Sequence, residues 1–345
     1  MDRPAANFSG YRSADAANRL TAVEASSILS QLSAAIRLGD RAECRKSVAR
    51  VRDLATGNDR NRRRLASAGA AVVLSTAFHA FSGVAAGPFD ILSEILSALV
   101  LVFELKDEEV FWGIGAPESM DSIVSILKSR DSSAMLDALL VLKEIVSFDR
   151  DLARAAAMID GLIEALVNLI KDPISPRATK LSLFVTFHLV ASAEEWTAAR
   201  FAGMGMISLI LETIVDSGTE KRMSELALSA FERLCGFEQG REKAYDNALT
   251  VPVLVRGMIG ISDLATDLAV SSLWKLYKSW EGEGGCVVIE ALEFGAFLKL
   301  LMLLQVDCRE GVREKATELM KFLNGRGEGL GCVDSRDFRG LNRPL

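Results

Sequence analysis

The sequence predicts an all-α protein, a right-handed α-solenoid of about seven stacked repeats. Its composition is rich in alanine, leucine and serine and only 7% aromatic, and alanine and straight-chain residues lose little freedom in a helix. An apolar helical pattern also recurs every 40 residues or so, within the range of about 40 to 47 that is typical of stacked two- and three-helix units. A length of 345 residues alone favours two domains, but stacked units share one core, so we expect a single array.

The first recurring element is a short apolar helix that follows a glycine or its substitute. Its copies are "SAGAAVVL" (67–74), "MIDGLIEAL" (158–166), "GMGMISLI" (203–210), "NALTVPVL" (247–254) and "EFGAFLKL" (293–300). We expect each copy to begin the second helix of a repeat.

A longer helix follows each short one, and seven copies of it align without a gap. They are "SVARVRDLA" (47–55), "ALVLVFELK" (98–106), "ALLVLKEIV" (138–146), "SLFVTFHLV" (182–190), "ALSAFERLC" (227–235), "AVSSLWKLY" (269–277) and "KATELMKFL" (315–323). Positions two, five and eight of this alignment are apolar in nearly every copy, as in Val48, Val51 and Leu54. This spacing places them on one helical stripe, which predicts a core that neighbouring repeats cover together.

This pattern resembles the armadillo repeat, in which a short helix and a second helix entered through glycine precede a long third helix that lines a concave groove. The resemblance covers roughly residues 27–324. It is closest to the C-terminal repeats of plant U-box ubiquitin ligases, on "LCGFEQGREKAYDNALTVPVLVRGMIGISDLATDLAVSSLWKLYKS" (234–279) and "LLQVDCREGVREKATELMKFL" (303–323). Those ligases carry an N-terminal U-box that docks the conjugating enzyme. Only 26 residues precede the first repeat here, so we expect the recognition part without a U-box.

The resemblance identifies the groove positions. Armadillo importins present a tryptophan and, four residues later, an asparagine, at alignment positions three and seven. Neither residue occurs at those positions here, so we do not expect this protein to act as a nuclear-import receptor. Position seven instead changes from acidic to basic along the chain: Asp53, Glu104, Glu144, His188, Arg233, Lys275 and Lys321. We expect a bipolar protein partner, with its basic end at the N-terminal repeats and its acidic end at the last three.

A predicted apolar patch lies on the same side of repeats two to four. It consists of Leu96, Val100, Leu136, Leu140 and Phe184. Contiguous exposed apolar surface usually marks a binding site. The alternatives are that the long helices are buried on more than one face, or that the register is displaced by one turn. The same register places Trp274 at the seam between repeats, in the column of Phe103 and Phe187.

No enzymatic site is expected. Five scattered cysteines without a C-x-x-C pair argue against a zinc site or a disulfide framework. His79 and His188 are the only histidines; neither accompanies a nucleophile signature, and His79 is expected to pack. "EGEGGCVVIE" (281–290) lacks the Lys-Ser/Thr ending of a phosphate-binding loop. We therefore expect no catalytic residue, no metal and no cofactor, although U-box relatives are ligases.

Charge and hydropathy limit the partners and the compartment. A formal charge of −6 argues against nucleic-acid binding, which needs a basic face. There is no run of 18 apolar residues, so we expect no membrane insertion and a cytoplasmic or nuclear protein. Residues 1–26 are expected to be a flexible segment, residues 27–324 the solenoid, and residues 325–345 a tail whose Val333, Phe338 and Leu341 cap the last repeat.

Three functions remain open. The first is a non-catalytic armadillo scaffold that binds a substrate or signalling partner and regulates protein ubiquitination, for which the resemblance implies immunity and receptor-kinase signalling. The second is the substrate-recognition region of an active U-box ligase whose catalytic domain lies outside this chain. The third is an unrelated armadillo adaptor.

Overall fold

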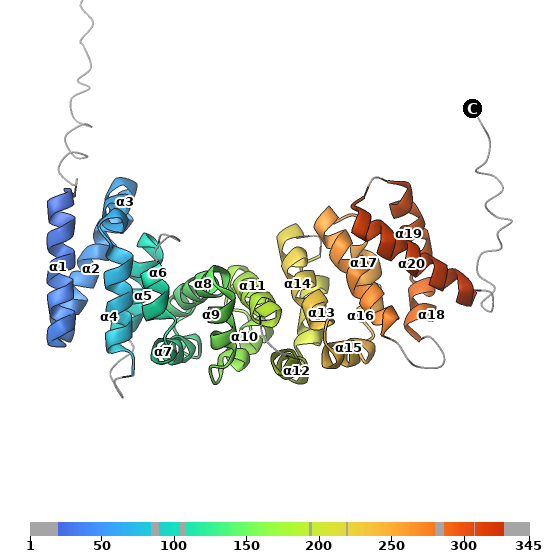
Figure 1. The fold of residues 1–345 in the computed structure, drawn as a ribbon, viewed down its shortest axis with the longest axis horizontal. Helices are drawn as coiled ribbons and strands as arrows, with labels where there is room; N and C mark the ends of the chain where they lie inside the picture. Colours follow the sequence, from blue (N-terminus) through green and yellow to red (C-terminus); the bar gives the residue numbers. More distant parts are fainter. Residues whose placement is uncertain are drawn as a thin grey trace, which may run out of the picture. The chain divides into compact units, whose positions relative to one another are not determined.

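The computed structural model describes residues 20–83, 90–103, 108–192, 195–218, 220–279, 286–306 and 308–327. Within these ranges the chain forms twenty α-helices and no strand (Figure 1). The helices divide between two compact units, residues 1–165 and 166–345, and the division falls inside α10. Each unit is described by itself.

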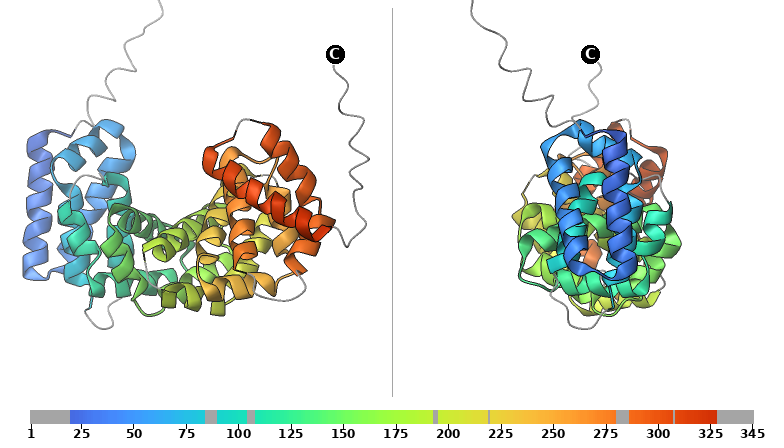
Figure 2. Two further views of the ribbon diagram at one scale, coloured as in Figure 1. Left: turned by 45° about the vertical axis from the view of Figure 1, so that its right-hand side comes forward. Right: turned by 90° about the vertical axis from the view of Figure 1, so that its left-hand side faces the viewer.

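Unit 1 contains α1 to α9 and the start of α10. The helices are α1 (Ala22–Leu38), α2 (Arg41–Gly57), α3 (Asp59–Ser67), α4 (Ala70–Phe81), α5 (Asp90–Val102), α6 (Glu108–Ile114), α7 (Pro117–Leu127), α8 (Ser132–Phe148), α9 (Arg150–Ala157) and α10 (Leu162–Lys171). Long helices pack in sequence order, α2 against α5 and α5 against α8. At the start of the unit, α1 covers α2 and α4 (Figure 2, right).

Unit 2 contains the rest of α10 and ten further helices. They are α11 (Pro176–Ser192), α12 (Glu195–Gly203), α13 (Met206–Asp216), α14 (Lys221–Leu234), α15 (Glu238–Tyr245), α16 (Thr250–Gly257), α17 (Asp263–Lys278), α18 (Cys286–Glu293), α19 (Ala296–Gln305) and α20 (Glu310–Gly327). The long helices again pack in order, α11 against α14, α14 against α17, and α17 against α20.

The predicted fold class is confirmed, because helices of unequal length repeat in the expected order. The seven aligned segments fall in α2, α5, α8, α11, α14, α17 and α20. Between consecutive long helices lie two shorter ones, so the repeats have three helices, except the first, which has only α1 and α2. The segment 98–106 is only partly helical, since α5 ends at Val102 and residues 104–107 lie outside the described ranges.

The predicted core stripe is confirmed at two of its three positions. Positions two and five are no more than 2% exposed in all seven long helices. Position eight is buried in the third to sixth repeats, whereas Leu54 of the first repeat and Phe322 of the last are half-buried; Leu105 of the second repeat lies outside the described residues. A terminal repeat has a neighbour on one side only, so part of its stripe remains accessible.

A left-handed glycine precedes four of the five predicted second helices. Gly69, Gly161, Gly205 and Gly295 have φ between 79° and 85°. The fifth copy has Leu249 in this place, with φ at −81°. Glycine adopts the left-handed conformation readily because it has no Cβ, whereas other residues pay a steric cost. The glycine therefore turns the chain from the first helix of a repeat into the second.

The boundary expected at residue 27 is too late. Helix α1 begins at Ala22, where Thr21 and Glu24 form a capping box in which each side chain accepts a hydrogen bond from the other residue's backbone N–H. This reciprocal pair satisfies two donors that would otherwise lack partners at the helix start. Residues 22–26 are thus part of the helix and not of a flexible segment.

The glycine at position 205 offers a test of this turn. Replacing Gly205 by alanine should destabilise unit 2 by about 1 kcal/mol, because a left-handed alanine is strained. A Cβ at Gly205 would meet no atom within 4 Å, so the effect would isolate the backbone. Gly203→Ala is the matched control: its site is also open but has no positive φ, and it should be neutral or slightly stabilising. Urea denaturation followed by circular dichroism measures both, and equal midpoints would contradict the assignment.

Candidate functional site

Each long helix has a solvent-facing side opposite its core stripe. Alignment positions three, six and seven lie on this side: in the described long helices they are half-buried or exposed, apart from Ser271, which is 5% exposed. The register used to identify groove positions from the sequence therefore agrees with the burial pattern. We call these residues the long-helix face, and describe it separately for each unit.

In unit 1 the long-helix face combines apolar and charged residues. Val100, Leu136 and Leu140 are half-buried. Two acidic residues of the same face, Asp53 and Glu144, each have a cationic side chain within 4 Å. Lys143 contacts Glu144 at 2.5 Å, and Arg52 lies 3.9 Å from Asp53. Glu104 lies outside the described residues. The acidic positions of this unit are therefore partly neutralised by their own neighbours.

Leu96 does not belong to this surface. Its side chain is fully buried, so its assignment to an exposed apolar patch was wrong. Leu96 lies three residues before Leu99 and six before Val102, and it therefore continues the buried stripe of α5. Helix α5 packs against α2, α3, α4 and α8, which leaves little of its surface accessible.

In unit 2 the same face carries an aromatic cluster at α11. The rings of Phe184 and His188 lie 4.4 Å apart, and the His188 ring meets the edge of Phe187 at 5.2 Å. The guanidinium of Arg233, from α14, lies over the Phe187 ring at 5.3 Å. Phe184, Phe187 and His188 are half-buried and Arg233 is exposed. Arg233 thus joins two successive repeats through a cation–π contact.

Lys275 is held by an acidic residue that the sequence prediction did not include. Its ammonium lies 2.6 Å from the Glu232 carboxylate and donates to the Glu232 carbonyl oxygen at 2.9 Å. The Ser271 hydroxyl donates to the same carboxylate at 3.1 Å, and Lys315 donates to the Ser271 hydroxyl at 2.8 Å. A polar chain therefore runs from α14 across α17 to α20.

Trp274 lies at a seam between repeats, as the register predicts. Its indole N–H donates to the Glu318 carboxylate of α20 at 2.5 Å, and the Lys278 ammonium lies 4.4 Å from the centre of its ring. We define the aromatic-basic strip of unit 2 as the residues of this face that carry aromatic or cationic groups. They are Phe184, Phe187, His188, Arg233, Trp274, Lys275 and Lys321.

The contacts that fix the strip join residues about one repeat apart. Trp274 and Glu318 are 44 residues apart, Lys275 and Glu232 are 43 apart, and Ser271 is 39 from Glu232. A search for opposite charges or donor and acceptor pairs separated by one period could have found Glu232 and Glu318. Reading one alignment column at a time missed them, because the partners stand in different columns.

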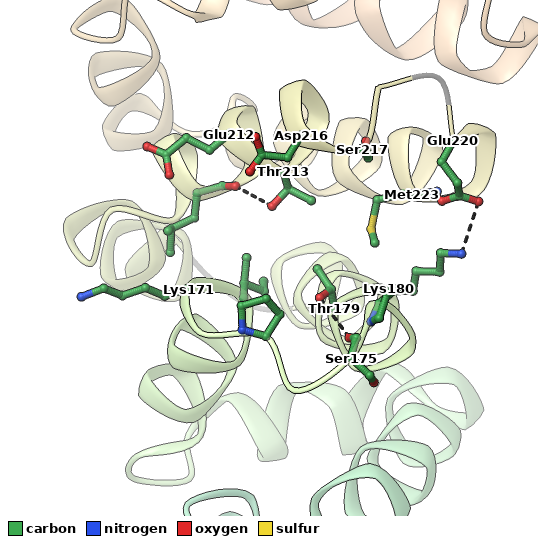
Figure 3. Close-up of a pocket in the computed structure, with 14 residues that line it drawn as sticks. Lys171, Ser175, Thr179, Lys180, Glu212, Thr213, Asp216, Ser217, Glu220 and Met223 are labelled. Atoms are coloured by element: carbon green, nitrogen blue, oxygen red, sulfur yellow. Dashed lines mark hydrogen bonds and ion pairs between the residues drawn. The ribbon is translucent and has the colours of Figure 1, made fainter. Parts of the chain in front are cut away.

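A pocket of about 450 Å³ opens elsewhere in unit 2, between the loop before α11 and the end of α13 (Figure 3). Lys180 pairs with Glu220 at 3.2 Å along one side, and Glu212 and Asp216 of α13 lie along the other. Burial raises the pKa of Glu220, but the backbone N–H of Met223 and the Lys180 ammonium lower it more, so its net pKa is below the ordinary value. The pocket mixes cations, carboxylates and apolar side chains.

The described residues contain no cluster suited to metal binding. No group of three or more His, Cys, Asp or Glu side chains in the described ranges could hold a metal ion. Burial raises the pKa of the Cys44 thiol to about 11 and also raises that of Cys235, which keeps both thiols protonated and unreactive. A serine and a histidine, Ser119 and His79, lie 3.2 Å apart. Ser119 is fully buried and donates to the Gly113 carbonyl, so it cannot reach a substrate.

His79 itself differs from expectation. It was predicted to pack in the core, but its side chain is exposed near the end of α4.

No single helix of the described ranges is long and apolar enough to span a membrane. Two pairs of consecutive helices meet the length and composition criteria only when both helices are taken together, and each pair is bent at its junction.

Comparison with known proteins agrees with this architecture. The family described as "Plant U-box protein ARM repeat region" matches residues 24–342. Two relatives from Arabidopsis thaliana are U-box domain-containing protein 21, 35% identical over 91% of this chain and 71% of its own length, and U-box domain-containing protein 20, 32% identical over 94% and 73%. The resemblance inferred from the repeats is confirmed.

Solved structures with the same fold are armadillo repeat proteins. The designed armadillo repeat protein YIII(Dq)4CqI has a TM-score of 0.57 at 16% identity, over 74% of this chain and 99% of its own. The designed armadillo repeat protein YIII(Dq.V1)4CPAF, in complex with peptide (KR)4, has a TM-score of 0.50 at 15% identity, over 87% of this chain and 100% of its own.

The link between Glu232 and Lys275 can be measured by a double-mutant cycle. Glu232→Gln removes the counter-charge of a half-buried ammonium and should destabilise unit 2 by about 1 to 2 kcal/mol. Lys275→Met should remove most of that penalty, giving a coupling of about 1 kcal/mol in chemical denaturation. Glu238→Gln, at an exposed site on α15, is the control and should change stability little. A coupling near zero would show that the pair does not join the repeats.

Proposed function

The chain belongs to the plant U-box protein ARM repeat family, and from this premise we propose that it binds a substrate or signalling partner on its long-helix face to regulate protein ubiquitination. The family and the fold support a protein-interaction scaffold related to ubiquitin ligases. The particular partner, the regulatory effect and a role in immune signalling through a receptor kinase are our proposal. We also propose that the protein acts in the cytoplasm or the nucleus.

The aromatic-basic strip is the observation that carries the proposal. Aromatic and arginine side chains contribute much of the energy of protein interfaces. Aromatic rings offer large contact areas with few rotatable bonds, and the planar arginine guanidinium forms directional contacts with carboxylates. Here they are also pinned by neighbours: Phe187 by Arg233, and Trp274 by Glu318. Side chains that are fixed before binding lose less conformational entropy when a partner arrives. The strip is thus suited to protein recognition.

The charges of the strip indicate which end of a partner it binds. Arg233 and Lys321 are exposed, and these two cationic side chains favour an acidic segment of the partner. The bipolar partner expected from the sequence remains our proposal, with its acidic end on unit 2. In unit 1, Asp53 and Glu144 already have Arg52 and Lys143 beside them, so the basic end of the partner would meet a weaker field.

Charge reversal tests this proposal. A partner is first recovered by affinity capture on the full chain, and its dissociation constant is then measured by calorimetry. Arg233→Glu and Lys321→Glu should each weaken binding roughly tenfold, about 1.4 kcal/mol, and more so at low salt. Lys243→Glu, at an exposed site on α15 outside the strip, is the control. Lys275→Glu is a poorer test because it would place a carboxylate against Glu232. Unchanged affinity in both variants would overturn the strip as the site.

A ubiquitination assay separates the scaffold from an active ligase. The chain is incubated with activating enzyme, conjugating enzyme, ubiquitin and the captured partner, with and without a separately supplied U-box protein. A scaffold should give ubiquitinated partner only when the U-box protein is present, because the U-box is what docks the conjugating enzyme. Transfer that requires a U-box fused to the chain, and that a separate U-box protein does not support, would favour the alternative, the recognition region of an active ligase. Captured partners without any ubiquitin-pathway or receptor-signalling protein would favour the third function, an unrelated adaptor.

A further inference from the structure

Helix α19, the second helix of the last repeat, has an apolar stripe on its outer side. Phe294, Leu298, Met302 and Val306 follow one another at intervals of four residues and are between 52% and 64% exposed. Leu298 and Met302 lie along one side of α19, and Phe294 and Val306 flank the two ends of the helix, before Gly295 and at the C-cap. Ala296 and Leu300 are fully buried, and Lys299 donates to the Val255 carbonyl of α16 at 2.8 Å. The outer stripe is therefore separate from the contacts that hold α19 in the repeat.

At the position of Met302, the other four second helices that the sequence repeat aligns have polar residues, whereas α7 has the buried Ile123. Counted from the residue that precedes each helix, the position of Met302 holds Thr76 in α4, Asn168 in α10, Glu212 in α13 and Arg256 in α16. All four are exposed although another repeat follows each of them. In these four helices a following repeat does not cover this position. A following repeat would therefore not have buried Met302, and the apolar character of α19 needs another explanation.

We propose that the stripe Phe294, Leu298, Met302 and Val306 is the docking surface for the C-terminal tail of the same chain, residues 328–345. Eighteen residues follow the end of α20 at Gly327, and they include Leu330, Val333, Phe338 and Leu341. The tail lies outside the described residues, and its sequence supplies the apolar side chains that the stripe would bury.

The geometry of the last repeat favours this occupant. Helix α20, to which the tail is joined, packs directly against α19 (Figure 1). Eighteen residues can extend about 60 Å, whereas a helix of ten residues is about 15 Å long, so the tail can follow the whole stripe. The family match also continues to residue 342, beyond the end of α20. An occupant that is already tethered binds at a high effective concentration, which a separate protein would lack.

The proposal is tested on the full chain by hydrogen exchange of residues 328–345. Exchange in the unmodified chain should be at least tenfold slower than in Leu298→Glu/Met302→Glu, a difference of about 1.4 kcal/mol. Thr76→Glu places the same charge at the equivalent exposed position of α4 and should leave tail exchange unchanged. Phe338→Glu changes only the tail, so it cannot unfold the helices, and it should accelerate exchange to the same extent as the α19 variant.

Two outcomes would overturn the proposal. If tail exchange is fast in the unmodified chain and equal in all variants, the tail does not cover α19. If sedimentation shows a dimer that Leu298→Glu/Met302→Glu dissociates while tail exchange stays unchanged, the occupant is a second copy. The proposal does not depend on the proposed function, because neither α19 nor the tail belongs to the aromatic-basic strip.

Discussion

The structure depends on the fact that each long helix has more apolar surface than its own repeat can cover. In α2, α5, α8 and the corresponding helices of unit 2, positions two and five are buried because a neighbouring long helix packs against them. Removing the neighbour would expose a continuous apolar stripe to water. Half-buried Leu54 and Phe322 show this effect on a small scale, since they lie in the first and the last repeat that the structure describes.

Polar contacts add specificity to this apolar stacking. Burial of the stripe is tolerant of small displacements, whereas a hydrogen bond between Trp274 and Glu318, or an ion pair between Glu232 and Lys275, requires one particular alignment of the helices. Glu232 and Lys275 are both half-buried, which strengthens their ion pair compared with pairs at a fully solvated surface. The long-helix face of unit 2 is therefore both the surface proposed to bind and part of what aligns the repeats.

The sequence predicted most of the fold because the fold is periodic. A pattern repeated seven times identifies the core stripe even where a single copy would be ambiguous, and the glycines mark where second helices begin. Prediction failed where a residue depends on contacts outside its own column. Leu96 was assigned to the surface although α5 is covered by four helices, and Glu232 was overlooked although it holds Lys275.

The contact between Glu232 and Lys275 has a consequence for any acidic ligand of this face. Glu232 already occupies Lys275 as a ligand carboxylate would, so the protein contains its own competitor for that cation. A ligand that displaces it exchanges one carboxylate for another and gains no additional ion pair there. The ionic-strength dependence of association would then arise mainly from Arg233 and Lys321, and discrimination among acidic ligands would depend on how well each replaces an intramolecular carboxylate.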